Sequence, residues 1–347
     1  MNLCADAVGA SYQASAQGLQ ITRDAIAQFY KNRISPENIQ LFASTSEAIG
    51  ALLKLLCAPG DEVVTCVPTY PLLDCLTSLE SVCLREIQLQ DCAGIWTIDF
   101  WALEQVCNEK TRAIIVVSPN NPTGHCITRD ELRHLNEFCA DRGIALIIDE
   151  VFACYRMDDE KSEELVCQPA CAMCARGLAV SLSGLSKVCG LPQHKLGWGC
   201  FGGDAQIVRE AMQRLSFITD STLSVSGWVQ RMAPYLLAHR EDFSKACNAR
   251  IRDNYRLLRD YARSHDVQWT VDRIDGGWSA CVRLPGWADD EIVATKLAEN
   301  GVRVFPGCFF GYRDTQPTLV VSLITVPEIY EAGIEKMAVL LHEILNG

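Results

Sequence analysis

Lys187 is the residue whose setting most clearly suggests chemistry. It lies in a loop of small residues within SLSGLSKVCGLPQHKLGWG, residues 181–199, between two apolar segments. Residues 177–182 before it and the GWGCFGG run after it are typical of buried strands. An amine on such a loop projects into a cleft, where partial desolvation lowers its pKa and makes it a nucleophile toward carbonyl groups. The alternative is a solvated lysine without a role, which is the usual state of a surface lysine.

Two further polar residues follow apolar strands. AIIVVSPNNPTG, residues 113–124, changes from a strand to a loop that contains Asn121, and IALIIDEVF, residues 144–152, has Asp149 at the end of a strand. Helical patterns separate these strands, which predicts a parallel sheet with crossover helices. Ligand sites in such sheets lie beyond the carboxyl ends of the strands. We therefore expect Asn121, Asp149 and Lys187 to meet at one edge of the sheet.

A potential anion site opens the segment ASTSEAIGALLKLLCAPG at residues 43–60. Ser44 and Thr45 precede a helical pattern, so free backbone N–H groups and the positive end of the helix dipole are expected beside them. Capping of the helix by these hydroxyl groups is the alternative explanation for their presence.

The pattern of elements predicts an α/β protein with two domains. Residues 35–235 are predicted to form a large domain with a mainly parallel sheet between helices. Residues 1–34 and 236–347, from both ends of the chain, are predicted to form a smaller α+β domain. The length of 347 residues also favours a large domain with a smaller companion. A long helix between 204 and 265 is expected to link the two.

Composition excludes several classes of protein. The net charge of -12 argues against nucleic acid as a partner, since that ligand needs clustered Lys and Arg. No apolar run has the length that spans a bilayer, so no membrane partner is expected. The N-terminal MNLCADAVGA lacks the basic and apolar regions of a signal peptide. A cytoplasmic location is the resulting expectation.

The 18 cysteines are scattered over predicted core strands and helices, as buried free thiols would be. Cys167, Cys171 and Cys174 have a C-x3-C-x2-C spacing similar to the iron–sulfur loop of radical S-adenosylmethionine enzymes, and Cys154 lies nearby. In a chain so rich in cysteine, chance explains this spacing better. We therefore predict no metal site.

Taken together, these segments resemble the class I/II aminotransferases, the fold-type I group of pyridoxal-phosphate enzymes. The resemblance runs from about Tyr12 to the end of the chain. It rests on SPNNPTG, on DEVF after a strand, and on LSK followed by GLPQHKLGWG. It implies pyridoxal 5'-phosphate as the cofactor, an amino acid and a 2-oxo acid as substrates, and a homodimer with shared active sites.

The resemblance also implies a role for each matching residue. Lys187 matches the lysine that forms the internal aldimine and then moves the proton between Cα and C4′. Asp149 matches the acid that pairs with the pyridine nitrogen and keeps the ring an electron sink. Asn121 matches the residue that hydrogen-bonds the phenolic oxygen of the cofactor. Tyr70, in PTYP, matches the aromatic residue that stacks on the ring, although packing alone can also explain it.

The cofactor phosphate is expected to meet the backbone amides of Ser44 and Thr45, together with Ser186 and Lys195. Tyr12 resembles the tyrosine that reaches this phosphate from the other subunit. That match implies the shared active sites of a dimer.

The chain also departs from the family pattern. Lys195 stands in place of the usual arginine, which replaces a planar fork with a point charge. Gly184 replaces the commoner Ser or Thr, and Phe152 replaces the tyrosine that also bonds the phenolic oxygen. The run TLVVSL lacks the arginine that holds the substrate carboxylate, and Val320 is the nearest match. The N-terminal arm of the family looks shortened. These departures concern substrate binding more than cofactor binding.

Three functional hypotheses follow. The first is a pyridoxal-phosphate-dependent aminotransferase. The second is a lyase, cyclase or racemase with the same cofactor and scaffold, which Phe152 and the missing arginine suggest. The third is a non-enzymatic effector-binding module, as in transcription regulators with this fold. It requires a DNA-binding domain, and the sequence before Tyr12 does not suggest one.

Overall fold

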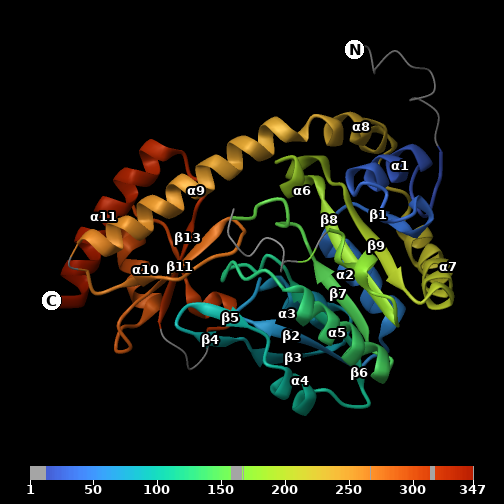
Figure 1. Ribbon diagram of the computed structural model, residues 1–347, viewed down its shortest axis with the longest axis horizontal. Coiled ribbons are helices and arrows are strands. Elements are labelled where there is room, and N and C mark those ends of the chain that lie inside the picture. The colour runs from blue at the N-terminus through green and yellow to red at the C-terminus, as the bar shows by residue number, and fades with distance from the viewer. Residues whose placement is uncertain (1–12, 158–165, 167, 266, 313–316, 347) are drawn as a thin grey trace.

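Two sheets organise the chain, and the long helix α9 (Arg240–Ser264) extends along both (Figure 1). The structure is a computed structural model, and it describes residues 13–157, 166, 168–265, 267–312 and 317–346.

The large sheet has the strand order β1-β9-β8-β7-β6-β2-β3. Strands β8, β7, β6, β2 and β3 are parallel, and β9 runs antiparallel to both of its neighbours, so the predicted mainly parallel sheet is confirmed. The strands are β1 (Ile39–Phe42), β2 (Glu62–Val67), β3 (Cys83–Gln88), β6 (Thr111–Val117), β7 (Ala145–Asp149), β8 (Leu178–Gly184) and β9 (Gly197–Gly203).

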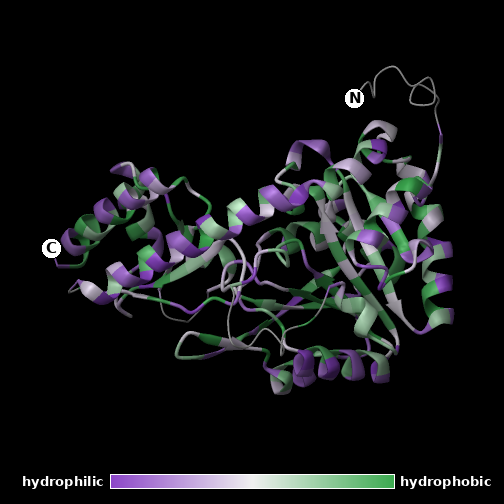
Figure 2. Ribbon diagram, turned by 45° about the horizontal axis from the view of Figure 1, so that its top comes forward, coloured by the Kyte–Doolittle hydropathy of each residue, from purple (hydrophilic) through white to green (hydrophobic). Residues whose placement is uncertain are grey.

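Successive side chains of the central strands enter two different cores. Ile114 and Ile148 belong to one core, and Ile115 and Ile147 to the other, as the period of two in a strand requires. Figure 2 shows hydrophobic residues along these strands and mixed hydropathy along the outer helices. Helices that contribute to the first core are α1 (Gln20–Phe29), α4 (Phe100–Val106), α5 (Arg129–Arg142) and α8 (Gly227–Ala238); those of the second are α2 (Thr45–Leu56), α3 (Leu72–Leu79) and α7 (Ala205–Thr222).

The small sheet is antiparallel, in the order β10-β11-β13-β12. It shares a third core with α9, α10 and α11. The elements are β10 (Thr270–Val271), β11 (Ser279–Arg283), α10 (Asp290–Glu299), β12 (Phe305–Pro306), β13 (Thr318–Ser322) and α11 (Pro327–Asn346). Short elements elsewhere are the pair β4 (Gln90–Cys92) and β5 (Ile95–Thr97), α6 (Leu185–Val188), and 3-10 helices at Pro36–Asn38, Ala170–Met173, Pro192–His194 and Gly307–Phe310.

Helix α1 differs from the expectation that residues 1–34 belong to the small domain. Its buried residues Ile26 and Ala27 lie in a core of the large sheet, and it packs against α8 and β1. In Figure 1 it lies at the opposite end of the molecule from α11. The apolar face of α1 therefore finds its partner on the large sheet. The boundary between 235 and 236 stays a prediction.

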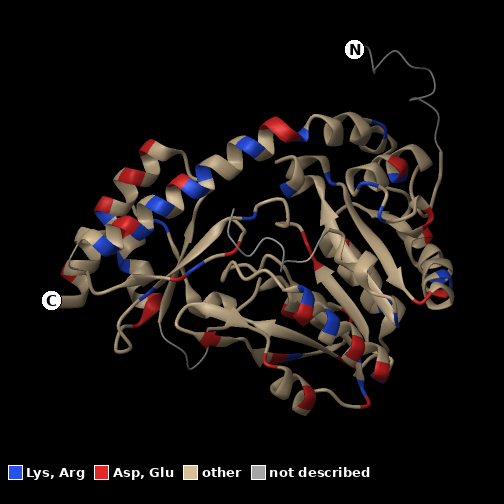
Figure 3. Ribbon diagram, in the orientation of Figure 1, with Lys and Arg blue, Asp and Glu red and all other residues tan. Residues whose placement is uncertain are grey.

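Charged residues of both signs lie mostly on helices, with few on the central strands (Figure 3). In the described part of the chain, no helix combines the length and the apolar character that crossing a membrane requires.

Candidate active site

A cavity of about 260 Å³ lies beyond the carboxyl ends of β6, β7 and β8. It brings together all the predicted site residues except Tyr12, which lies outside the described residues. Those that line it are Ser44, Thr45, Tyr70, Asn121, Asp149, Phe152, Ser186, Lys187 and Lys195. Segments from five separate parts of the sequence thus meet where the parallel sheet predicted a ligand site.

The ionisable groups Lys187 and Asp149 come from neighbouring strands. Asp149 ends β7, opposite Leu182 of β8, and Lys187 lies in the short helix that follows β8. Burial lowers the pKa of Lys187, although the nearby Asp149 carboxylate opposes this effect. Burial raises the pKa of Asp149 to about 6, against a hydrogen bond from Val151 N at 3.1 Å and the charge of Lys187. The pair therefore combines an amine with nucleophilic character and an acid that lacks a strong partner.

Aromatic rings surround the Lys187 amine. Its Nζ lies 5.2 Å from the ring centroid of Trp278 and 5.6 Å from that of Phe152. These two rings contact each other edge to face at 5.5 Å. Tyr155 lies beside Trp278 and donates a hydrogen bond from its hydroxyl to the Lys187 carbonyl. These apolar neighbours explain the desolvation of the amine.

The sequence prediction missed Trp278 and Tyr155. Trp278 comes from the start of the small sheet, and only the paired glycines before it, in DGGWSACV, indicated a close backbone approach.

The start of helix α2 lies at the cavity, where the sequence predicted a potential anion site. Ser44 caps the helix, with its Oγ accepting a hydrogen bond from Glu47 N at 3.1 Å, and the first N–H groups of a helix have no intrahelical partner. Gly197 lies against this turn, because a Cβ there would come within 2.9 Å of the Ser44 carbonyl carbon and 3.0 Å of Thr45 N. Glycine thus allows the strand after Lys195 to approach the helix start.

Gly184, which departs from the family pattern, has a packing reason. A Cβ at this residue would lie 2.9 Å from the Leu196 carbonyl oxygen. A Ser or Thr at this position would therefore push the end of β8 away from the start of β9.

Asn121 and Tyr70 border the cavity on the other side. The Ser279 hydroxyl donates a hydrogen bond to Asn121 Oδ1 at 3.3 Å, which leaves the amide N–H groups of Asn121 to act as donors. Tyr70 is 47% exposed, so its ring lies at the rim of the cavity and not in the core. The loops that carry the two residues are tied by Asn120 Nδ2, which donates to the Pro68 carbonyl at 3.1 Å.

These observations fit pyridoxal phosphate. Within the described residues, the desolvated carboxylate of Asp149 accepts a backbone hydrogen bond from Val151 N, and a protonated pyridine nitrogen is a suitable further partner for it. The helix start, with Ser186 and Lys195, suits a phosphate. The Lys187 amine suits an aldehyde carbon.

The structure shows the surroundings of Val320, the residue nearest in sequence to the arginine that the family uses for the substrate carboxylate. Val320 is buried in β13 between Cys281 and Phe305. Arg283, on the adjacent strand, already hydrogen-bonds Asp272 and Asp91. The cations that line the described cavity are Lys187 and Lys195.

The structure describes two of the three cysteines with the C-x3-C-x2-C spacing. Cys171 and Cys174 are buried free thiols whose pKa values are raised by burial, and Cys167 lies outside the described residues. Within the described ranges, no group of three His, Cys, Asp or Glu side chains is placed to hold a metal ion.

Comparison with known proteins agrees with this geometry. The profile of the family described as aminotransferase class I and II matches residues 10–331. The glutamate-pyruvate aminotransferase of Haemophilus influenzae is 24% identical over 343 residues, which cover 93% of this chain and 81% of that protein. The alanine aminotransferase of Mycobacterium tuberculosis is 25% identical over 279 residues, 79% of this chain and 61% of that protein.

Solved structures show the same fold. The tyrosine aminotransferase of Leishmania infantum has a TM-score of 0.87 at 18% identity, over 99% of this chain and 85% of its own. The alanine aminotransferase of Pyrococcus furiosus has a TM-score of 0.85 at 21% identity, over 98% of this chain and 86% of its own. With the profile match over residues 10–331, the chain belongs to the class I and II aminotransferase family, the pyridoxal-phosphate-dependent transaminases.

Proposed function

We propose that Lys187 is the lysine that holds the cofactor covalently and then carries a proton between the substrate Cα and the cofactor carbon C4′. The observation that carries this proposal is its partly desolvated amine, which shares a cavity with the under-partnered carboxylate of Asp149. Pyridoxal phosphate, when bound, supplies an electron sink for negative charge at the substrate Cα. Burial lowers the pKa of Lys187 and so favours the neutral amine, which is the form that can accept the proton that leaves.

The other residues of the cavity are proposed to hold and orient the cofactor. Asp149 pairs with the pyridine nitrogen, and Asn121 donates from its amide to the phenolic oxygen. Tyr70, at the rim, covers the ring face. At the opposite end, the N–H groups of Ser44 and Thr45 bind the phosphate.

Ser186 and Lys195 complete the phosphate site from the loops around Lys187. Tyr12 of a second subunit is proposed to reach the same phosphate. The net reaction is the transfer of an amino group between an amino acid and a 2-oxo acid.

Borohydride reduction of the purified holoenzyme, followed by peptide mapping, tests the assignment of Lys187. We expect the pyridoxyl group on the peptide that contains Lys187, and we expect Lys187→Ala to lose this label and turnover. Lys195→Ala is the matched control, because it also removes a cavity lysine but should keep the label on Lys187. A label on another lysine would refute the assignment.

Product analysis tests the reaction class. A transaminase converts its bound cofactor to the pyridoxamine form and releases a keto acid when an amino acid is added alone. An eliminating lyase can also release a keto acid, but a lyase, a cyclase and a racemase all return the cofactor to its pyridoxal form. Formation of the pyridoxamine form in a single turnover therefore separates a transaminase from these reactions.

Exposed apolar side chains support the proposal of a homodimer. Ile21 of α1, Phe217 of α7, Leu223, and Trp228 of α8 are 53%, 81%, 68% and 45% exposed, and the three helices lie at one end of the molecule (Figure 1). Large apolar side chains that are exposed on one subunit are common at protein interfaces. Light scattering should give twice the chain mass, and Phe217→Glu should give monomers.

We place the enzyme in the cytoplasm, in agreement with its composition.

A further inference from the structure

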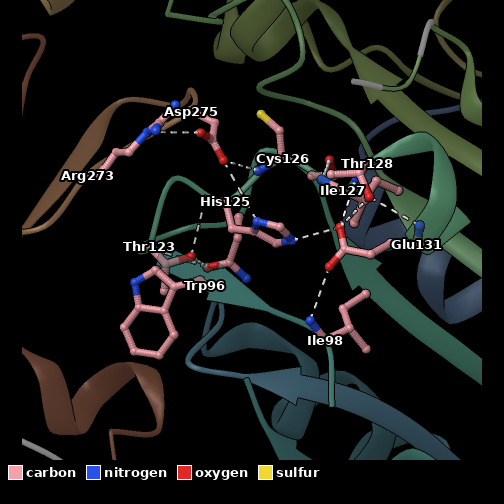
Figure 4. Close-up of polar contacts among 12 residues, drawn as sticks. Trp96, Ile98, Thr123, His125, Cys126, Ile127, Thr128, Glu131, Arg273 and Asp275 are labelled. Carbon is pink, nitrogen blue, oxygen red and sulfur yellow. Dashed lines mark hydrogen bonds and ion pairs between the residues drawn. The ribbon is translucent and has the colours of Figure 1, made fainter. Parts of the chain in front are cut away.

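His125 is a buried histidine next to the active-site loop, outside the cavity just described. It follows Gly124 of the SPNNPTG motif and is 7% exposed. Its Nε2 lies 3.3 Å from Glu131 Oε2, and its Nδ1 lies 3.8 Å from Asp275 Oδ2 (Figure 4). The imidazole therefore lies between two carboxylates.

The two carboxylates belong to different parts of the fold. Glu131 lies in the first turn of α5, on the large sheet, where it accepts hydrogen bonds from Thr128 N at 2.8 Å and Ile98 N at 3.1 Å. Asp275 lies in the segment that leads into the small sheet, where its Oδ2 accepts from Cys126 N at 3.4 Å. His125 thus connects the small sheet to a helix of the large one.

The electrostatics of the cluster favour the charged imidazole. Burial alone would lower the pKa of His125, but the Asp275 and Glu131 carboxylates, both at ion-pair distance, raise it to about 9. His125 in turn lowers the pKa values of both carboxyl groups, against their burial. Arg273 adds a further positive charge, with its Nε 3.7 Å from Asp275 Oδ1. Within the described residues, these are the charged groups around His125, and they hold it as a cation at neutral pH.

The segment that begins with Asp275 is hydrogen-bonded to two loops, which contain Gly124 and Tyr155. Asp275 N and Gly276 N both donate to the Gly124 carbonyl at 3.0 Å, and Gly277 N donates to the Tyr155 carbonyl at 2.7 Å. A Cβ on Gly276 would come within 2.6 Å of the same Tyr155 oxygen. Backbone hydrogen bonds therefore hold the segment against the loops of Gly124 and Tyr155, in addition to the His125–Asp275 pair.

Active-site groups follow directly on this segment. The Trp278 ring lies 5.2 Å from Lys187 Nζ, and the Ser279 hydroxyl holds Asn121 Oδ1 at 3.3 Å. A displacement of the segment would move the ring that desolvates Lys187. It would also release the bond that orients Asn121.

We propose that His125 is a positioning residue, which through Asp275 fixes the segment carrying Trp278 and Ser279 against the loop carrying Asn121. The inference rests on the proposed role of Lys187, because it assigns His125 an effect on the surroundings of that amine. The Glu131 side of the cluster anchors His125 itself to α5.

Two matched variants of the holoenzyme test the proposal. Asp275→Asn weakens the contact of His125 with the segment, whereas Glu131→Gln weakens its contact within the large sheet and keeps a residue that suits the capping box of α5. The readouts are the pH midpoint of the cofactor's visible absorption band, kcat and KM, and the free energy of unfolding in urea.

For Asp275→Asn we expect the band midpoint to rise by about half a pH unit, because a less well oriented Asn121 stabilises the phenolate less. We expect kcat to fall about ten-fold with little change in KM, as misplacement of reacting groups produces. Glu131→Gln should lower the free energy of unfolding and leave the midpoint unchanged. In a His125→Gln background, Asp275→Asn should add little further shift.

The proposal is wrong if Asp275→Asn leaves the midpoint and kcat unchanged, or if Glu131→Gln changes both as much. It is also wrong if the shifts of His125→Gln and Asp275→Asn simply add. A failure of the proposed function is distinguished beforehand, since borohydride would then label a lysine other than Lys187 in the unmodified holoenzyme.

Discussion

Two groups of buried ionisable residues lie within the same fold and respond to burial in opposite ways. In the cavity, burial lowers the pKa of Lys187 and raises that of Asp149, so both groups shift toward their neutral forms. In the His125 cluster, His125 has a raised pKa while Glu131 and Asp275 have lowered ones, so all three shift toward their charged forms.

The difference comes from the number and kind of partners. Asp149 receives a backbone hydrogen bond from Val151, and Lys187 faces two aromatic rings. Glu131 receives two backbone N–H groups and faces an imidazolium. A cluster whose members are opposite charges at ion-pair distance stabilises the fold, whereas a cluster whose charges have few partners is suited to bind a charged ligand.

The largest expected effect comes from Asp149→Asn. Activity should fall by about 100-fold or more, the usual result of removing a key electrostatic partner. The folded pKa of Asp149, about 6, lies above its ordinary value of 3.8, so this group lowers stability as pH rises through that range. The variant should therefore stabilise the cofactor-free protein at pH 7.5 by about 1–3 kcal/mol, measured by urea unfolding. A loss of stability would show that the carboxylate is already compensated.

His125→Gln should lower the stability of the fold, whereas Asp149→Asn should raise it. Its effect on activity should also be smaller. The folded pKa of about 9 lies above the unfolded value, so the stabilisation is complete below about pH 6.5 and is lost as pH rises through 9. We expect a loss of about 2 kcal/mol at pH 6 and much less at pH 9.5. His342→Gln, on the exposed face of α11, is the control and should change neither value. Equal losses at both pH values would mean that charge is not the cause.

Lys195→Ala tests whether the cavity needs the Lys195 cation to hold the cofactor phosphate. A charge-assisted hydrogen bond contributes about 1.5–3 kcal/mol, so the cofactor dissociation constant should rise about ten-fold or more. Lys195→Arg need not improve binding. Equilibrium dialysis measures the constant, with Lys54→Ala as the control. An unchanged constant for Lys195→Ala would remove this residue from the site.

Phe152→Tyr should have the smallest effect. The added hydroxyl group can donate to the phenolic oxygen of the cofactor and favour its ionised form. We expect the pH midpoint of the visible band to fall by about half a unit, with cofactor binding retained. A spectral titration measures this. An unchanged midpoint would mean that residue 152 faces Lys187 and not the phenolic oxygen.

The sequence predicted the cavity better than its surroundings. Lys187, Asp149 and Asn121 each end a strand-to-loop transition, so local pattern and the geometry of a parallel sheet were sufficient to bring them together. The hydroxyl residues before a helical pattern had already indicated Ser44 and Thr45, and the match of the motifs to a family then added Ser186 and Lys195.

Residues that depend on the packing of the small sheet could not be predicted in this way. Trp278 meets Lys187, and Asp275 meets His125, across large separations in sequence, and no local pattern encodes such contacts. The packing of helix α1 against α8 and β1 could not be predicted for the same reason, since an amphipathic helix shows that it needs a partner but not which one.

The backbone hydrogen bonds made by residues 275–277 also bear on how the small sheet can move. Because these bonds join the small sheet to the loops at Gly124 and Tyr155, the segment is a fixed point about which the small sheet could rotate. In a rotation about this pivot, Trp278, which lies next to it in the chain, would travel a short arc. Elements farther from the pivot, such as α10, would travel a long one. A rotation of this kind would leave the Lys187 amine with its aromatic neighbour.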